Sequence, residues 1–89
     1  MTKMRLEIQN IKGLHARASA KLVEVVEQFD ATATVSKDGE QTSADSIMGL
    51  LMLAASIGTF IEVETFGPQA DALAAAIEEL VADKFGEGD

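Results

Sequence analysis

The chain has 89 residues and a formal net charge of −8, with 47% hydrophobic residues and no cysteine. This length suits one small domain, and the hydrophobic content excludes intrinsic disorder. The lack of cysteine excludes a disulfide framework, a thiolate metal site and a cysteine nucleophile. The only aromatic residues are four phenylalanines, so we expect no base-stacking surface for single-stranded nucleic acid.

The charges are divided unevenly along the chain. Residues 1–21 carry five of the seven basic residues and only one of the 15 acidic residues. An acidic protein repels nucleic acid and anionic membranes, but this basic end can attract an anionic group. The sequence contains neither an apolar run long enough to span a bilayer nor the apolar core of a signal peptide. We therefore expect a cytoplasmic protein with no nucleic-acid partner and no membrane insertion.

The first half of the chain alternates between strand and helix patterns. Apolar and polar residues alternate over residues 4–8, which predicts a half-buried strand. Apolar residues then recur at helical spacing over residues 16–29, and a second strand follows at 32–36. The pair at 38–39, Asp-Gly, predicts a tight type I′ hairpin, with residues 40–43 as the return strand.

The second half continues in the same way. The pair at 45–46, Asp-Ser, precedes the apolar run 47–53 and predicts a capped helix start. That short helix is expected to end near residues 56–58. Residues 59–66 alternate again as a strand, and Leu73, Ile77, Leu80, Val81 and Phe85 form the apolar stripe of a final helix.

The predicted order is therefore βαββαβα, in one domain spanning residues 1–89. Strands and helices in this order, with one tight hairpin, indicate an α+β sandwich whose helices pack on one face of an antiparallel sheet. Residues 86–89 are expected to form a frayed tail.

The one histidine, His15, lies where a loop becomes a helix. The first backbone N–H groups of a helix lack partners, and the positive end of the helix dipole favours an anion there. Arg17 can bring a planar guanidinium to phosphate oxygens, and Lys12 and Lys21 add positive potential. On these residues alone, a phosphate site competes with a plain helix cap or a surface histidine.

This combination suits reversible phosphoryl transfer. A neutral imidazole nitrogen is a lone-pair nucleophile near pH 7 and can attack a phosphoryl group without a metal. The product is labile, because protonation of the other ring nitrogen makes imidazole a good leaving group. A metal site is a poor alternative, because one histidine without cysteine cannot supply three or four ligands, so we expect no cofactor. A hydrolase is also disfavoured, since no second catalytic base stands out.

Two motifs resemble those of a known family. The run GLHAR at 13–17 is similar to the active-site motif of the HPr family, the histidine-containing phosphocarriers of the phosphoenolpyruvate-dependent sugar phosphotransferase system. The run SIMGLL at 46–51 is similar to its second signature, and the likeness covers residues 3–85. The resemblance implies an open-faced β-sandwich, with a four-stranded antiparallel sheet and three helices on one face.

The resemblance also implies an activity and its partners. Enzyme I, charged by phosphoenolpyruvate, would place a phosphoryl group on Nδ1 of His15, with Ala16, Arg17 and Ala18 binding the phosphate. The chain would then pass it to an enzyme II A component or to a nitrogen-related equivalent. A carrier of this kind is not an independent enzyme and is best suited to be a monomer.

The chain departs from the family motif at one point. The family has Pro and then Ala after the arginine, whereas this chain has Ala18 and Ser19. Proline pre-sets φ in the first helical turn, so we expect a slightly looser helix start without loss of function. The nitrogen-related paralogue of the family therefore stays open as an assignment.

Ser46 has two compatible interpretations. From the residues alone, it is an N-cap of the second helix. By resemblance, it matches the serine that HPr kinase/phosphorylase modifies in many bacteria, where a phosphate would add negative charge beside a docking surface. The residues that match partner-docking positions of the family are Leu14, Ala20, Ile47, Met48 and Leu51.

Two other functions remain as alternatives. Small size, acidity and Asp-Ser-Ile at 45–47 are similar to the phosphopantetheine attachment site of acyl carrier proteins, which would use Ser46. Acyl carriers are helical bundles, however, and the alternating runs predict strands. A small interaction module, with His15 incidental, is the other alternative.

Overall fold

The computed structural model describes residues 1–87, which form a four-stranded sheet covered by helices. The strands are β1 (Thr2–Glu7), β2 (Thr32–Lys37), β3 (Glu40–Ser43) and β4 (Phe60–Phe66). The helices are α1 (Ala16–Glu27), α2 (Ile47–Met52) and α3 (Ala70–Ala82), followed by the 3-10 turn η1 (Lys84–Gly86). The predicted order βαββαβα and the α+β class are confirmed.

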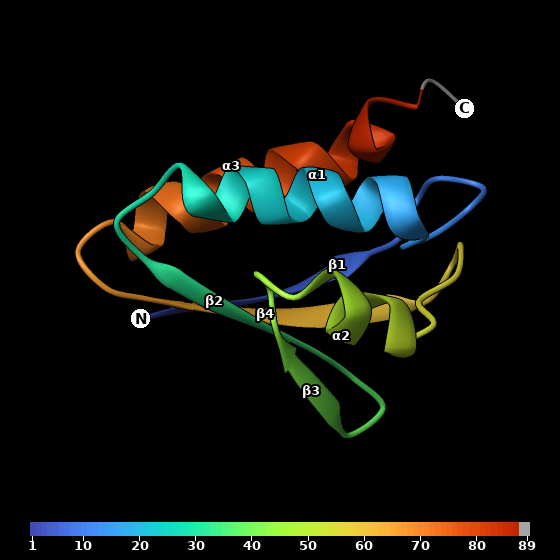
Figure 1. The fold of residues 1–89 in the computed structure, drawn as a ribbon, viewed down its shortest axis with the longest axis horizontal. Coiled ribbons are helices and arrows are strands. Elements are labelled where there is room, and N and C mark those ends of the chain that lie inside the picture. Colours follow the sequence, from blue (N-terminus) through green and yellow to red (C-terminus); the bar gives the residue numbers. More distant parts are fainter. Residues whose placement is uncertain (88–89) are drawn as a thin grey trace.

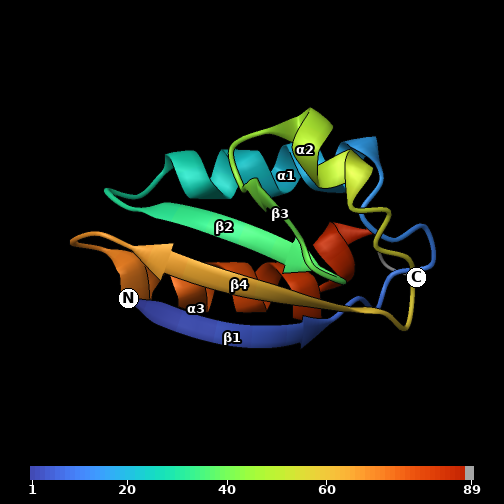
Figure 2. The same cartoon turned by 90° about the horizontal axis from the view of Figure 1, so that it is seen from below.

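The sheet is antiparallel throughout, with strand order β1-β4-β2-β3. Helices α1 and α3 lie side by side over one face of the sheet (Figure 1). Seen from below, the strands lie in front of helices α1 and α3, so that this face of the sheet is open (Figure 2). The architecture is therefore the expected open-faced sandwich.

Strand β4 shows why the sheet has one covered face. Ile61, Val63 and Thr65 are buried, whereas Phe60 and Glu62, on the other side of the strand, are exposed. Successive side chains of a strand point to opposite faces, so the alternating sequence buries one row under the helices. The predicted alternation over 59–66 is confirmed.

One hydrophobic core joins the sheet to the helices. Its largest members include fully buried residues from β4, α1, α2 and α3: Ile61, Val63, Leu22, Leu50, Leu73 and Ile77. Each such side chain stabilises the fold by about 1.5–3 kcal/mol relative to an exposed position.

The β2–β3 hairpin turns at Asp38 and Gly39, whose φ angles of 51° and 85° fit the predicted type I′ turn.

Helix α2 is shorter than the sequence pattern indicates. It was expected to continue to residues 56–58, but it ends at Met52. Ala54 has a φ of 53°, in the left-handed region where a right-handed helix cannot continue. The carbonyl of Ala55 then accepts a hydrogen bond from the N–H of Leu14 at 2.8 Å. The loop that follows α2 is therefore hydrogen-bonded to the segment that precedes α1.

The C-terminal segment also differs from expectation. Helix α3 ends at Ala82, so that Phe85, expected on its apolar stripe, lies in η1 with a φ of 55°. Phe85 is nevertheless fully buried. Gly86 and Glu87, predicted to belong to a frayed tail, are instead placed by η1 and by side-chain contacts with His15 and Asn10. The rest of the predicted tail, residues 88–89, lies outside the described residues.

Candidate functional site

His15 is the N-cap residue of α1, as the sequence pattern predicted. Its backbone is extended, with φ −78° and ψ −175°, and its side chain makes no capping hydrogen bond. The first hydrogen bond of the helix runs from the Ser19 N–H to the His15 carbonyl at 2.8 Å. The imidazole is therefore available for chemistry at the helix N-terminus.

The backbone N–H groups of Ala16, Arg17 and Ala18 precede that first helical bond. They have no partner within the helix, and the dipole of α1 adds partial positive charge at this end. Ala16 and Arg17 are exposed, whereas the Ala18 side chain is fully buried against the core. The three N–H groups together make a site that favours an anion such as a phosphoryl group.

Arg17 lies on this exposed turn. Among residues 1–87, the ion pairs are His15 with Glu87 and Lys37 with Asp38, so the Arg17 guanidinium has no carboxylate partner in this part of the chain. A solvated guanidinium two residues after His15 can reach phosphoryl oxygens at this end of the helix, with a planar fork suited to them.

The loop before His15 is held closely to the loop after α2. Gly13 has a φ of 65°, and a Cβ at this position would lie 2.4 Å from the Ala55 carbonyl oxygen. Leu14 is only 4% exposed, and its carbonyl accepts a hydrogen bond from Ser19 Oγ at 3.2 Å. Leu14 therefore supports the site from the core, and it offers almost no area of its own to a docking partner.

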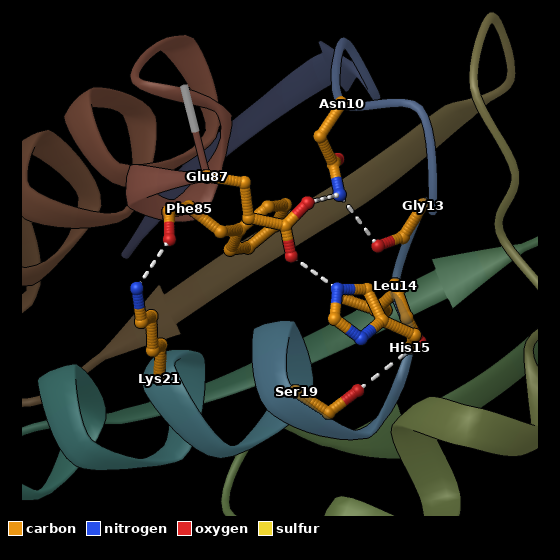
Figure 3. A network of polar contacts seen from close by, with 8 residues as sticks. All are labelled: Asn10, Gly13, Leu14, His15, Ser19, Lys21, Phe85 and Glu87. Carbon is orange, nitrogen blue, oxygen red and sulfur yellow. Dashed lines mark hydrogen bonds and ion pairs between the residues drawn. The ribbon is translucent and has the colours of Figure 1, made fainter. Parts of the chain in front are cut away.

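Glu87 reaches His15 from the far end of the sequence. Its Oε2 contacts Nε2 of the imidazole, and its Oε1 accepts a hydrogen bond from Asn10 Nδ2 at 2.9 Å. Asn10 is fully buried, and its Nδ2 also donates to the Gly13 carbonyl at 2.8 Å. Figure 3 shows the carboxylate between the amide and the imidazole ring. Glu87 thus contacts the candidate nucleophile on its Nε2 side, and Asn10 supports that carboxylate.

The Glu87 carboxylate is charged at neutral pH. Its pKa is lowered from the ordinary value by the hydrogen bond from Asn10, then by that from His15, and further by the nearby charges of His15 and Lys12, against an opposing effect of burial. A carboxylate that accepts hydrogen bonds is stabilised in its ionised form. The group facing Nε2 is thus an anion that accepts hydrogen bonds.

Lys21 makes a specific hydrogen bond in addition to contributing positive potential. Its Nζ donates to the carbonyl of Phe85 at 2.7 Å, which connects α1 to η1 (Figure 3). Lys12 is exposed on the loop before the site. The basic residues of the N-terminal region therefore include one that holds the C-terminal segment near His15.

Ser46 caps α2 as predicted. Its Oγ accepts a hydrogen bond from the Gly49 N–H at 3.1 Å, and its carbonyl accepts one from Leu50 at 3.0 Å. Beside it, Ile47 and Met48 are 39% and 70% exposed. Met52, which the sequence did not single out, is 73% exposed on the same short helix.

The apolar surface around α2 includes the other residues that match docking positions. Ala20 on α1 and Leu51 on α2 are both partly exposed. Unbranched methionine side chains adapt to more than one surface, which suits a protein with several partners. Except for the buried Leu14, the predicted docking residues are thus accessible to a partner.

The sequence pattern did not point to Asn10 or Glu87 as part of the site. Asn10 carried one usable signal, because asparagine is common in turns that precede a helix. Glu87 carried none, since it lies 72 positions from His15 in a segment without periodicity. No group of three or more metal-ligating side chains occurs among the described residues 1–87, and none of the helices there is long and apolar enough to cross a membrane.

A small open-faced sandwich that presents one histidine at the start of its first helix has the form of a phosphoryl carrier protein. The family model "PTS HPr component phosphorylation site" matches residues 2–83. The chain belongs to this family, the phosphocarriers of the phosphotransferase system, and its function is that of a phosphoryl carrier and not of an independent enzyme.

Relatives and solved structures agree with this assignment. The chain is 46% identical over 82 residues to the phosphocarrier protein HPr of Cupriavidus necator, with 92% of each chain covered. It is 41% identical over 86 residues to the phosphocarrier protein NPr of Escherichia coli strain K12, with 96% of each covered. The crystal structure of HPr-C-His from Thermoanaerobacter tengcongensis matches with a TM-score of 0.93 and 34% identity, covering 98% of each chain.

These findings also decide between the sequence-based alternatives. The four-stranded sheet is incompatible with the helical bundle of an acyl carrier protein, so Ser46 is not a phosphopantetheine site of that kind. The family assignment likewise replaces the small interaction module by a phosphoryl carrier. Relatives named HPr and NPr both match, so the match does not by itself distinguish between these two kinds of phosphocarrier.

Proposed function

We propose that His15 accepts a phosphoryl group on Nδ1 from phosphorylated enzyme I and donates it to an enzyme II A component or a nitrogen-related equivalent. One observation carries the assignment to this residue. The imidazole lies at the N-terminus of α1 without making a capping hydrogen bond, beside backbone N–H groups that lack helical partners. Those N–H groups, with Arg17, favour the negative oxygens of the group in transit.

The reaction can proceed in both directions because the intermediate is labile. A phosphorylated imidazole with a proton on its second nitrogen is a good leaving group. The exposed Arg17 can follow the phosphoryl oxygens during approach and departure, since its side chain has no ion-pair partner among residues 1–87. The protein supplies position and electrostatic stabilisation, which are the main contributions in phosphoryl transfer.

The first experiment measures phosphoryl uptake. Purified chain, phosphoenolpyruvate, magnesium and a charged enzyme I should yield one acid-labile phosphoryl group, detected by intact mass and ³¹P NMR. His15→Ala should reduce incorporation at this position to background, because no other imidazole exists in the chain. Arg17→Ala, which leaves the nucleophile intact, serves as the comparison and should still incorporate phosphate. Full incorporation into His15→Ala would contradict the proposal.

The surface around α2 fits the docking of these partners. Ala20, Ile47, Met48 and Leu51 are accessible there, close to the start of α1. We assign the chain to the cytoplasm as a monomeric single domain, because one core joins its elements and a carrier must present the same site to successive enzymes. HPr kinase/phosphorylase is a further partner in this proposal, acting on Ser46.

Two substitutions at Ser46 separate its effect on stability from its effect on partner docking. Ser46→Asp retains an N-cap acceptor but adds negative charge beside the docking surface, so we expect a several-fold higher KM for phosphorylated enzyme I with little change in stability. Ser46→Ala removes the bond to the Gly49 N–H and should cost about 1 kcal/mol of unfolding free energy with an unchanged KM. Transfer kinetics and thermal unfolding of both variants check this. Equal KM values in the two variants would remove the regulatory role of Ser46.

A further inference from the structure

We infer that Glu87 is a positioning residue for the phosphoryl-accepting imidazole: its carboxylate keeps the ring proton on Nε2 of His15 and so leaves the lone pair on Nδ1. The inference rests on the proposed role of His15 as the acceptor. It concerns a residue at the opposite end of the chain, which the active-site motif does not contain.

The contact determines which nitrogen can be the donor. A carboxylate can only accept hydrogen bonds, so the Nε2 that contacts Glu87 Oε2 must carry the hydrogen. In a neutral imidazole, the other nitrogen then holds the free lone pair. Figure 3 shows that nitrogen on the side of the ring away from Glu87. The tautomer set by Glu87 is thus the one needed for attack by Nδ1.

The carboxylate is itself held in place. Its second oxygen accepts from the Nδ2 of Asn10 at 2.9 Å, and Asn10 is fully buried. The side chain of Glu87 is 9% exposed, against 26% for His15. A charge-assisted hydrogen bond is stronger where water is largely excluded. Glu87 is therefore held in one orientation against the imidazole, unlike a surface carboxylate that moves freely.

The backbone of the C-terminal segment is also anchored. Phe85 is fully buried, and its carbonyl accepts from Lys21 Nζ at 2.7 Å. The N–H of Glu87 donates to the Lys84 carbonyl at 3.0 Å. The first bond connects η1 to the middle of α1, and the second holds Glu87 against the turn that precedes it. They account for the placement of a residue so near the end of the chain.

The imidazole neither gains nor loses a proton during the transfer. The Nδ1 lone pair forms the N–P bond while the donor's bond to phosphorus breaks, and that electron pair leaves with the donor. The Nε2 proton stays in its hydrogen bond to Glu87, whose charge stabilises the positive ring. When the group moves on, the N–P pair returns to Nδ1 and the ring is neutral again. Glu87 thus supports both uptake and donation.

The test is Glu87→Gln, which retains the shape of the side chain but removes its charge. Imidazole ¹⁵N shifts should show mainly the Nε2–H tautomer in the unmodified chain and a mixture in the variant. The kcat for uptake from phosphorylated enzyme I should fall roughly tenfold, less than for a buried triad carboxylate because His15 is partly exposed. The KM should stay within about twofold, since the contact positions the nucleophile and does not dock the partner.

Two further variants control for charge and geometry. Glu78→Gln removes the same charge from an exposed position on α3 and should change neither the tautomer nor kcat. Glu87→Asp keeps the carboxylate on a shorter side chain and should restore part of the Nε2–H tautomer and of kcat. Recovery with the conservative variant distinguishes positioning of the imidazole from a merely structural role of the segment.

Three results would overturn the inference: an unchanged tautomer and kcat in Glu87→Gln, a faster uptake that identifies the carboxylate as a cover over His15, or a change in KM alone. The proposed function fails separately, if the unmodified chain takes up no phosphoryl group from an enzyme I shown to be charged. In that case the ¹⁵N tautomer, which needs no phosphoryl transfer, still decides whether Glu87 positions the ring.

Discussion

Gly13→Ala is expected to cause a large combined loss of stability and phosphoryl uptake. Residue 13 has a φ of 65°, and an added Cβ would lie 2.4 Å from the Ala55 carbonyl oxygen and 2.9 Å from the Cα of Ser56. Both neighbours are backbone atoms, so the clash cannot be relieved by a rotamer change. We expect a decrease of about 2–4 kcal/mol in the free energy of unfolding, measured by urea denaturation.

The functional effect follows from the same contact. The Leu14 N–H donates to the Ala55 carbonyl at 2.8 Å, so displacement of that carbonyl disturbs the residue before His15. Uptake from phosphorylated enzyme I, corrected for the folded fraction, should fall at least tenfold, because misplacement of a nucleophile by about 1 Å can cost two orders of magnitude.

Gly39→Ala is the matched control. It also has a positive φ, 85°, but a Cβ there would meet nothing within 4 Å. It therefore measures backbone strain without a clash, and we expect a loss of about 1 kcal/mol with normal uptake per folded molecule. If the two variants were equally stable and equally active, the close approach of Gly13 to Ala55 would not hold the site.

The sheet and helices could be predicted because burial imposes a local period on the sequence. In β4, Ile61 and Val63 alternate with exposed residues, and in α1, Leu22 and Val26 recur one helical turn apart. The Asp38 and Gly39 turn was also predictable, since few residue pairs adopt two positive φ angles. These features depend on neighbours only a few positions away.

The position of His15 was predictable for the same reason, but its surroundings were not. An N-cap is a local feature, and the motif at 13–17 places it at the start of a helix. The contact between Asn10 and Glu87 joins residues 77 positions apart, and it depends on how η1 packs against α1. No periodicity of the sequence encodes such a pair. The early end of α2 was missed likewise, because nothing in the apolar run signals that Ala54 adopts a left-handed conformation.

Phe85 shows how burial overrides local backbone preference. Its φ of 55° costs about 1–2 kcal/mol for a residue other than glycine. Complete burial of a phenylalanine side chain contributes about 1.5–3 kcal/mol, which is enough to offset that strain. The apolar spacing correctly indicated a buried residue at 85, but it could not reveal that the helix ends before this position.

Phe85→Ala should therefore be strongly destabilising, although it lies close to the end of the chain. Removing a fully buried ring leaves a cavity, and we expect the free energy of unfolding to fall by about 3–5 kcal/mol. Alanine does not relieve the positive φ, so no gain in backbone energy compensates. Thermal and urea unfolding followed by circular dichroism measure the loss.

The substitution also tests whether η1 positions Glu87. Without the Phe85 ring, the carbonyl that accepts from Lys21 Nζ and the adjoining Glu87 lose their anchor, so the Nε2–H tautomer of His15 should be less populated in the folded fraction. Phe66→Ala, at a position that is 38% exposed at the end of β4, is the control and should cost about 1 kcal/mol without changing the tautomer. Similar losses of stability in both variants, with the His15 tautomer unchanged, would show that the C-terminal turn neither completes the core nor orients the imidazole.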